Sequence, residues 1–103
     1  MRLNDFTGKA VLISGGTKGI GLATGLTFAR RGAQVWLTHR WGSADEDAIR
    51  ARFAELGAPA PRIVEADASR EEDMRAVLSA IKEQHDRVDV FISNVCVVMR
   101  GDG

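Results

Sequence analysis

Four short apolar runs alternate with segments of helical periodicity, and this alternation constrains the fold more than any other feature of the chain. The runs span residues 10–14, 34–38, 62–66 and 88–93, and they are rich in β-branched and aromatic residues. Near-continuous apolarity is typical of parallel strands that are covered on both faces. The order β-α-β-α-β-α-β implies right-handed crossovers. We therefore predict an α/β fold with a parallel sheet and helices on both of its faces.

The intervening segments carry helix signals. The first ends at Arg30-Arg31-Gly32, where basic residues followed by glycine are a stop signal. For the second and third we predict N-caps at Ser43 and Ser69, with Glu72 completing a capping box after Ser69. The apolar face of the first helix is predicted to contain Ile20, Ala23, Thr27 and Phe28.

Composition limits the class of protein. The chain has 103 residues, of which 45% are hydrophobic, and its 14 basic and 14 acidic residues cancel. We expect one domain over residues 1–103, with no nucleic-acid or membrane partner, because such binders usually carry a basic excess. No apolar run approaches the ~18 residues of a membrane helix. The single cysteine favours a reducing, cytoplasmic location.

A glycine-rich loop between the first strand and the first helix is the strongest functional signal. It reads Ser14-Gly15-Gly16-Thr17-Lys18-Gly19-Ile20-Gly21. Glycines at this G-x3-G-x-G spacing permit a tight turn and close approach of a pyrophosphate to the start of a helix. A Walker loop is excluded by Leu22, and the common G-x-G-x-x-G pattern by Thr24. The alternative is a glycine-rich turn without a ligand.

These residues resemble the cofactor signature of the short-chain dehydrogenases/reductases. Residues 4–10 resemble the family's lead-in to its first strand, Asp67-Ala68 its Asp-Val/Ala pair, which contacts the adenine, and Asn94 the Asn-Asn-Ala-Gly motif. The resemblance covers essentially the whole chain. It implies a Rossmann-like, incomplete doubly wound fold with strand order 3-2-1-4. It also implies a set of cofactor-binding residues: Gly15, Thr17, Lys18, Gly19, Ile20, Gly21, Asp67, Ala68 and Asn94.

The chain departs from the family pattern in two ways. The last motif reads Ser93-Asn94-Val95-Cys96, so that cysteine replaces a glycine. The family's catalytic Ser and Tyr-x3-Lys lie after this segment, and the sequence contains no tyrosine. We therefore expect no catalytic residue in these 103 residues. The chain resembles the cofactor-binding half of such an enzyme, without its catalytic half.

The end of the second strand bears on which dinucleotide binds. It reads Thr38-His39-Arg40 and holds no acid, and Lys18 adds a cation from the glycine loop. A ribose 2′-hydroxyl is read by Asp or Glu, whereas a 2′-phosphate favours cations. We therefore predict NADP, with His39 and Arg40 among the cofactor-binding residues. The alternative is that Arg40 and Lys18 are solvated surface charges.

Weaker candidates have structural explanations. His39 and His85 lack a second nearby ligand, so we expect no metal site. Asp67 serves either the adenine edge or a turn before Ser69.

Two functions fit these motifs. The first is the N-terminal part of an NADP-dependent oxidoreductase that acts on a carbonyl or alcohol. The second is a non-catalytic dinucleotide-binding module that is complete at 103 residues. The uncharged run Val90-Phe91-Ile92 would leave the fourth strand as an open apolar edge. A complete module should protect such an edge with charges, proline or a cover, so this edge favours the first function. The same edge predicts a homo-oligomer or association with the missing half, and a small-molecule substrate is expected only when that half is supplied.

Overall fold

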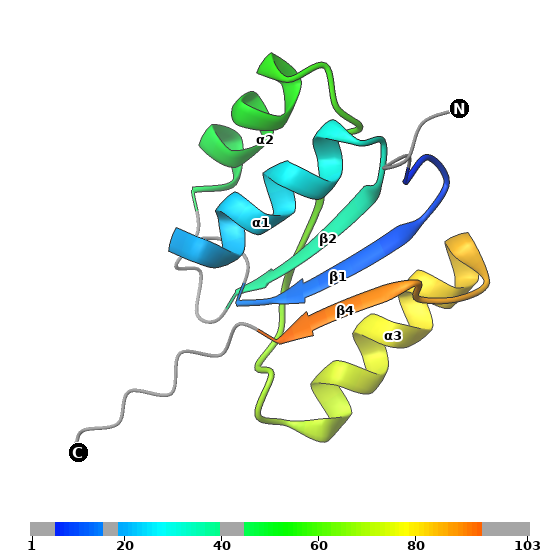
Figure 1. Ribbon diagram of the computed structural model, residues 1–103. Helices are drawn as coiled ribbons and strands as arrows, with labels where there is room; N and C mark the ends of the chain where they lie inside the picture. Colours follow the sequence, from blue (N-terminus) through cyan, green and yellow to red (C-terminus); the bar gives the residue numbers. More distant parts are fainter. Residues whose placement is uncertain (1–5, 16–18, 40–44, 94–103) are drawn as a thin grey trace.

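The chain folds into a four-stranded parallel sheet with helices on both faces. The computed structural model describes residues 6–15, 19–39 and 45–93. The strands lie in the order β3-β2-β1-β4, and every neighbouring pair is parallel (Figure 1). Their order along the chain is β1 (Ala10–Ser14), α1 (Gly19–Arg30), β2 (Gln34–His39), α2 (Glu46–Glu55), β3 (Arg62–Glu65), α3 (Glu71–His85) and β4 (Val90–Ser93). The predicted fold class and strand order are confirmed.

Two apolar clusters hold the layers together. Helices α1 and α2 lie on one face of the sheet and α3 on the other (Figure 1). Alternate residues of the central strands serve opposite clusters: Val11 and Ile13 face α1 and α2, whereas Ala10 and Leu12 face α3. All of these side chains are buried, which explains why the strand reads as an unbroken apolar run.

The predicted apolar face of α1 is wrong. Ile20 is 79% exposed, and Ala23 and Thr27 are also exposed, whereas Phe28 is half-buried. The buried positions of this helix are Gly21, Leu22, Gly25, Leu26 and Ala29. A Cβ at Gly25 would lie 3.1 Å from Leu37 Cδ2 and 3.4 Å from Ile13 Cδ1. Glycines on this face therefore allow α1 to approach the sheet closely. Because glycine carries no apolar side chain, they do not contribute to the apolar periodicity from which the face was predicted.

The predicted helix caps are also wrong. Asp45 is the N-cap of α2, and its carboxylate accepts a hydrogen bond from the Ala48 N–H at 3.1 Å. Ser43 lies outside the described residues. Arg70 is the N-cap of α3 and makes no side-chain capping bond. The Ser69 hydroxyl instead donates to Asp67 Oδ1 at 2.7 Å, so the expected capping box is not formed.

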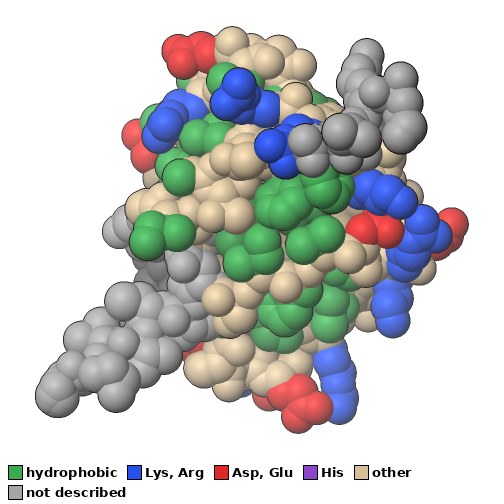
Figure 2. Space-filling view, viewed as in Figure 1, with side chains coloured by type: hydrophobic (Ala, Val, Ile, Leu, Met, Phe, Trp, Pro, Cys, Tyr) green, Lys and Arg blue, Asp and Glu red, His purple; other side chains and the backbone are tan. Residues whose placement is uncertain are grey.

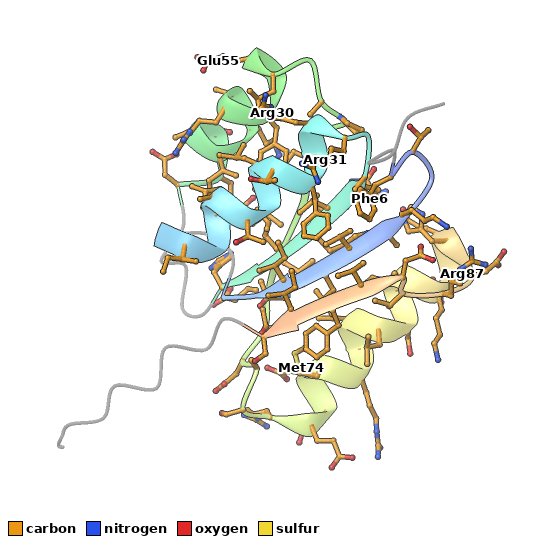
Figure 3. The ribbon with its side chains drawn as sticks, in the orientation of Figure 1. Phe6, Arg30, Arg31, Glu55, Met74 and Arg87 are labelled. Carbon is orange, nitrogen blue, oxygen red and sulfur yellow. The ribbon has the colours of Figure 1, made fainter. Side chains whose placement is uncertain are left out.

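The amino end of the sheet is closed by hydrogen bonds. The Ala10 N–H donates to Asp89 Oδ2 at 2.8 Å, and Arg87 Nε donates to Asp89 Oδ1 at 2.7 Å. The hydrogen bond from Arg87 and that from Ala10 hold the pKa of Asp89 below its ordinary value. Figure 3 shows Phe6, Arg31 and Arg87 at this end of the molecule, where the Phe6 N–H donates to the Arg31 carbonyl at 2.8 Å.

The two edges of the sheet differ in character. The β3 edge has a charged residue at each end, Arg62 and Glu65, and both are exposed. The β4 edge consists of Val90, Phe91, Ile92 and Ser93, and Phe91 is 52% exposed. Figure 2 shows hydrophobic side chains gathered over β1 and β4 on this face of the molecule. Among the helices of the described ranges, none is long and apolar enough to cross a membrane.

Candidate functional site

The carboxyl ends of the parallel strands and the start of α1 lie at the same end of the molecule (Figure 1). Ligands of open α/β sheets bind outside the carboxyl ends of the strands. Seven of the residues expected to bind a cofactor lie in this region within the described ranges: Gly15, Gly19, Ile20, Gly21, His39, Asp67 and Ala68. Thr17, Lys18, Arg40 and Asn94 lie outside the described residues.

Two glycines of the loop adopt left-handed backbone conformations. The φ angle of Gly15 is 69° and that of Gly19 is 55°. A Cβ built on Gly19 meets no atom within 4 Å, so the space beside it is open. The Gly15 N–H donates to Thr38 Oγ1 at 3.1 Å, which ties the turn after β1 to the end of β2. Gly15 therefore shapes the turn, and Gly19 leaves room at the start of the helix.

The N-terminus of α1 has an unusual charge pattern. The first turn of α2 contains Glu46 and Asp47, and that of α3 contains Glu71, Glu72 and Asp73. The first turn of α1 contains no acidic residue. A helix N-terminus has a partial positive charge and N–H groups without helical partners. Acids compensate that charge in α2 and α3, whereas no acid of the first turn does so in α1, an arrangement that suits an anion.

Within the described ranges, three of the five buried polar side-chain atoms without hydrogen-bond partners lie at the same end, and the other two, Trp36 Nε1 and His85 Nε2, lie between the sheet and α3. The three are Ser14 Oγ at the end of β1 and both ring nitrogens of His39 at the end of β2. The side chain of His39 is only 4% exposed, and its Nε2 lies 3.5 Å from Glu46 Oε2. Buried polar groups without partners are rare in folded proteins and often mark functional positions. Here these three atoms lie at the carboxyl ends of β1 and β2.

The end of β3 is organised by Asp67. Its carboxylate Oδ1 accepts hydrogen bonds from the N–H and the hydroxyl of Ser69, at 2.9 and 2.7 Å. Its own N–H donates to Asp73 Oδ2 at 2.9 Å. The sequence analysis gave a turn before Ser69 as the alternative role of Asp67, and that turn is present. Ala68 lies half-buried within it. Contact of Asp67 and Ala68 with an adenine stays a prediction.

Several residues of this region were missed by the sequence analysis. Gly25 continues the spacing Gly21-x3-Gly25 along one face of α1, and that repeat is the signal that could have identified it. Thr38, Glu46 and Asp73 act through partners that are 23, 7 and 6 residues distant in the sequence, respectively. No local pattern marks such partners, because the fold brings them together.

The described residues fit an anionic nucleotide. The open space at Gly19, the uncompensated start of α1 and the unpartnered His39 together suit a pyrophosphate and its attached ribose. Within the described ranges, no three His, Cys, Asp or Glu side chains are grouped as a metal site would require.

Comparisons with known proteins agree with this geometry. The family model "short chain dehydrogenase" matches residues 9–102. The chain is 37% identical over 95 residues to 11-beta-hydroxysteroid dehydrogenase A of Sesamum indicum, covering 91% of this chain and 27% of that protein. It is 31% identical over 86 residues to short-chain dehydrogenase/reductase FrzI of Cladobotryum sp, covering 84% of this chain and 33% of that protein.

A solved structure is similar in both fold and sequence. The NADH-dependent reductase A1-R′ complexed with NAD superposes with a TM-score of 0.75 at 33% identity, covering 85% of this chain and 36% of that chain. The chain thus spans about a third of the length of the relatives it matches. The family match extends over nearly all of the sequence, from β1 through β4. The chain therefore belongs to the short-chain dehydrogenase family.

Proposed function

We propose that this chain binds NADP(H) and forms the cofactor-binding part of an oxidoreductase that acts on a carbonyl or alcohol. The observation that carries the proposal is the start of α1, where Gly19 leaves open space and the first turn contains no acid. The bound cofactor would supply hydride chemistry. The chain's own residues would bind and orient it, with the pyrophosphate on the helix N-terminus and the adenine beside Asp67 and Ala68. A cytoplasmic location belongs to the same proposal.

The preference for NADP(H) rests on sequence. Arg40 follows β2 directly and Lys18 lies within the glycine loop. Two cations at these positions suit a 2′-phosphate, because each hydrogen bond between charged groups is worth about 1.5–3 kcal/mol. We assign the 2′-phosphate to Arg40 and Lys18.

The proton donor must come from elsewhere. Reductases of this type use a positioned acid, often a phenol, and the sequence has no tyrosine. We propose that a further polypeptide segment supplies the acid and positions the substrate. The exposed Phe91 and the uncharged β4 edge suit pairing with such a segment or with a second copy.

Calorimetric titration of NADP⁺ and NAD⁺ tests the cofactor assignment. The variant Arg40→Asp should weaken NADP⁺ binding by roughly tenfold or more and narrow or invert the preference over NAD⁺. Arg52→Asp, which reverses an exposed charge in the last turn of α2, is the matched control. Equal losses of affinity for both dinucleotides would show that Arg40 does not bind the 2′-phosphate. Absence of binding to either dinucleotide by the unaltered chain would refute the proposed function.

Catalytic competence and association are tested together on the 103-residue chain. Oxidation of NADPH with a panel of ketones should be undetectable, and light scattering should show species larger than the monomer. Turnover by a monodisperse 11.2-kDa monomer would contradict both expectations.

A further inference from the structure

A cavity of about 180 Å³ lies between β3 and α3, on the face of the sheet opposite α1 and α2 (Figure 1). Its side-chain lining comes from Val64 and Ala66, in β3 and directly after it, and from Asp73, Ala76, Val77 and Ala80 of α3. None of the described residues assigned above to the cofactor is among them. The cavity is therefore a second concave site, separate from the start of α1.

The lining of the cavity is largely apolar and extends along the helix. Its four α3 residues recur at i, i+3, i+4 and i+7, so they form one stripe about 10 Å long. The two alanines leave room between α3 and Val64, and Ala76 is exposed, so the cavity is open to solvent. Its volume is below the ~300–1,000 Å³ of most small-molecule sites, so its occupant is small. A linear chain of about six carbons would match the length of the stripe.

One end of the cavity contains a carboxylate that has no cationic partner. Asp73 is half-buried, and its Oδ2 accepts a hydrogen bond from the Asp67 N–H at 2.9 Å. Arg70 and Arg75 are close to it in the sequence, but both pair with other acids. Within the described ranges Asp73 itself forms no ion pair. A charge beside apolar surface costs free energy unless it is paired, so the cavity favours an occupant with a positive charge.

Glu65 also lines the cavity, but its carboxylate is directed elsewhere. Side chains alternate along a strand, and β3 directs Val64 toward α3 and Ile63 toward α1 and α2. The side chain of Glu65 therefore lies on the same face as that of His39, its partner in the strand register. Glu65 lines the cavity through its backbone, and Asp73 alone sets the charge of the site.

The surroundings of the Asp73 carboxylate select the kind of cation. Within the described residues Oδ1 has no hydrogen-bond partner, whereas Oδ2 is already engaged by Asp67. A guanidinium binds both oxygens of a carboxylate, whereas an ammonium is a point charge that one oxygen satisfies. A metal ion would need more ligands, and the described part of the chain has no group of three His, Cys, Asp or Glu side chains. An ammonium is therefore the cation that fits.

We propose that the cavity between β3 and α3 binds a small alkylammonium ion, which pairs with Asp73 and extends its chain along Ala76 and Ala80. The charged group contributes selectivity, because a neutral chain of the same length would leave Asp73 without a partner. The apolar contacts contribute affinity in proportion to the area that they bury. This inference goes beyond the proposed function, since it requires no bound dinucleotide.

Titration of the 103-residue chain with n-hexylammonium chloride, followed by nuclear magnetic resonance without dinucleotide, tests the site. Saturable shifts are expected at the backbone amides of Ala66, Ala76 and Ala80. n-Hexylammonium should bind roughly tenfold more tightly than n-butylammonium, because it buries two more methylenes. n-Hexanol should bind about fivefold more weakly than n-hexylammonium, the loss expected for one partly exposed ion pair. n-Hexylguanidinium should also bind more weakly than n-hexylammonium.

Two pairs of variants locate the charge and the chain. Asp73→Asn keeps an acceptor for the Asp67 N–H and should remove the preference for n-hexylammonium over n-hexanol. Glu72→Gln, which neutralises an exposed acid of the same turn, should keep that preference. Ala76→Leu should weaken both probes by about tenfold, because it fills the cavity. Ser79→Leu, which adds the same side chain at an exposed position outside the lining, should not.

N-acetyl-lysine N-methylamide distinguishes a free amine from a lysine side chain of another protein. It should bind more weakly than n-butylammonium, because its peptide groups would lie against apolar residues. Tighter binding would overturn the assignment to a small free amine.

Three results would refute the site altogether: no saturable shifts at the lining, equal affinity for n-hexylammonium and n-hexanol, or equal effects of Asp73→Asn and Glu72→Gln. Because no dinucleotide is present, none of these results bears on the proposed function, which the dinucleotide titrations test separately.

Discussion

The two ends of the sheet differ in how the polar groups at the strand ends are partnered, although His85 Nε2, at the end of α3, is also buried without a partner among the described residues. At the amino end, the Asp89 carboxylate satisfies the Ala10 N–H and pairs with Arg87, and the Asp89 N–H returns a hydrogen bond to the Ala10 carbonyl. At the carboxyl end, Ser14 Oγ and both nitrogens of His39 are buried without partners in the described residues. The same strands connect the two ends, so the difference arises from the loops and helix termini that cover them.

This difference predicts that the amino end mainly supports stability and that the carboxyl end mainly supports binding. The hydrogen bond from the Ala10 N–H to Asp89 contributes to folding, because Ala10 is buried and its N–H would otherwise have no partner there. The unsatisfied groups at the carboxyl end lower the stability of the fold, and a bound ligand would restore it. Changes at the carboxyl end should therefore alter binding more than folding, and changes at the amino end should do the reverse.

The largest effect is expected for Gly19→Val. A β-branched side chain would enter the open space beside the start of α1 and block approach of the pyrophosphate. It would also impose a left-handed conformation on valine, because φ at this position is 55°. Calorimetry should show that dinucleotide binding is abolished, while circular dichroism retains the helical signal.

Gly57→Val is the control for backbone strain. Gly57 follows α2, has φ of 68° and also has open space beside it. Each substitution should cost about 1–2 kcal/mol of unfolding free energy from the left-handed backbone. Only Gly19→Val should remove binding. Normal binding by Gly19→Val would place the phosphate site elsewhere in the molecule.

Gly32→Ala tests the amino end. Its φ is 95°, and a Cβ there would lie 2.6 Å from Thr7 Oγ1 and 3.2 Å from the Thr7 backbone. Urea denaturation should show a loss of about 2–4 kcal/mol, from strain and steric overlap together. The dissociation constant for dinucleotide, measured under folding conditions, should stay unchanged. A higher dissociation constant without a loss of stability would contradict the assignment of stability to the amino end and of binding to the carboxyl end.

The smallest effect concerns acid stability through Asp89. The folded-state pKa of this carboxyl is lowered, first by the hydrogen bond from Arg87 and then by that from Ala10. A lowered pKa contributes stability that is fully present above the ordinary value of 3.8 and is lost as pH falls through the folded value.

Acid unfolding of Asp89→Asn tests that contribution. The variant should be less stable than the unaltered chain near neutral pH, and the two curves should converge in acid. A difference that is constant with pH would show that packing, rather than charge, is responsible.

Prediction from sequence succeeded where local pattern and burial agree. The strands were predicted because β1 and β2 are buried on both faces and read as apolar runs. It failed on the face of α1, where the contact residues include Gly21 and Gly25. It also failed at the caps, because Asp45 caps α2 and the Ser69 hydroxyl bonds to Asp67 instead of to the start of α3.

The sequence by itself determined the fold class, the strand order expected from the family resemblance, and the position of the glycine loop between β1 and α1. These follow from short-range periodicity and from glycines that left-handed turns require. The tertiary structure alone decided which acid lies close to His39 and which hydroxyl accepts a hydrogen bond from the Gly15 N–H. Those contacts join different elements, since Glu46 comes from α2 and Thr38 from β2. Their distances depend on how the layers pack, and no pattern along the chain encodes that packing directly.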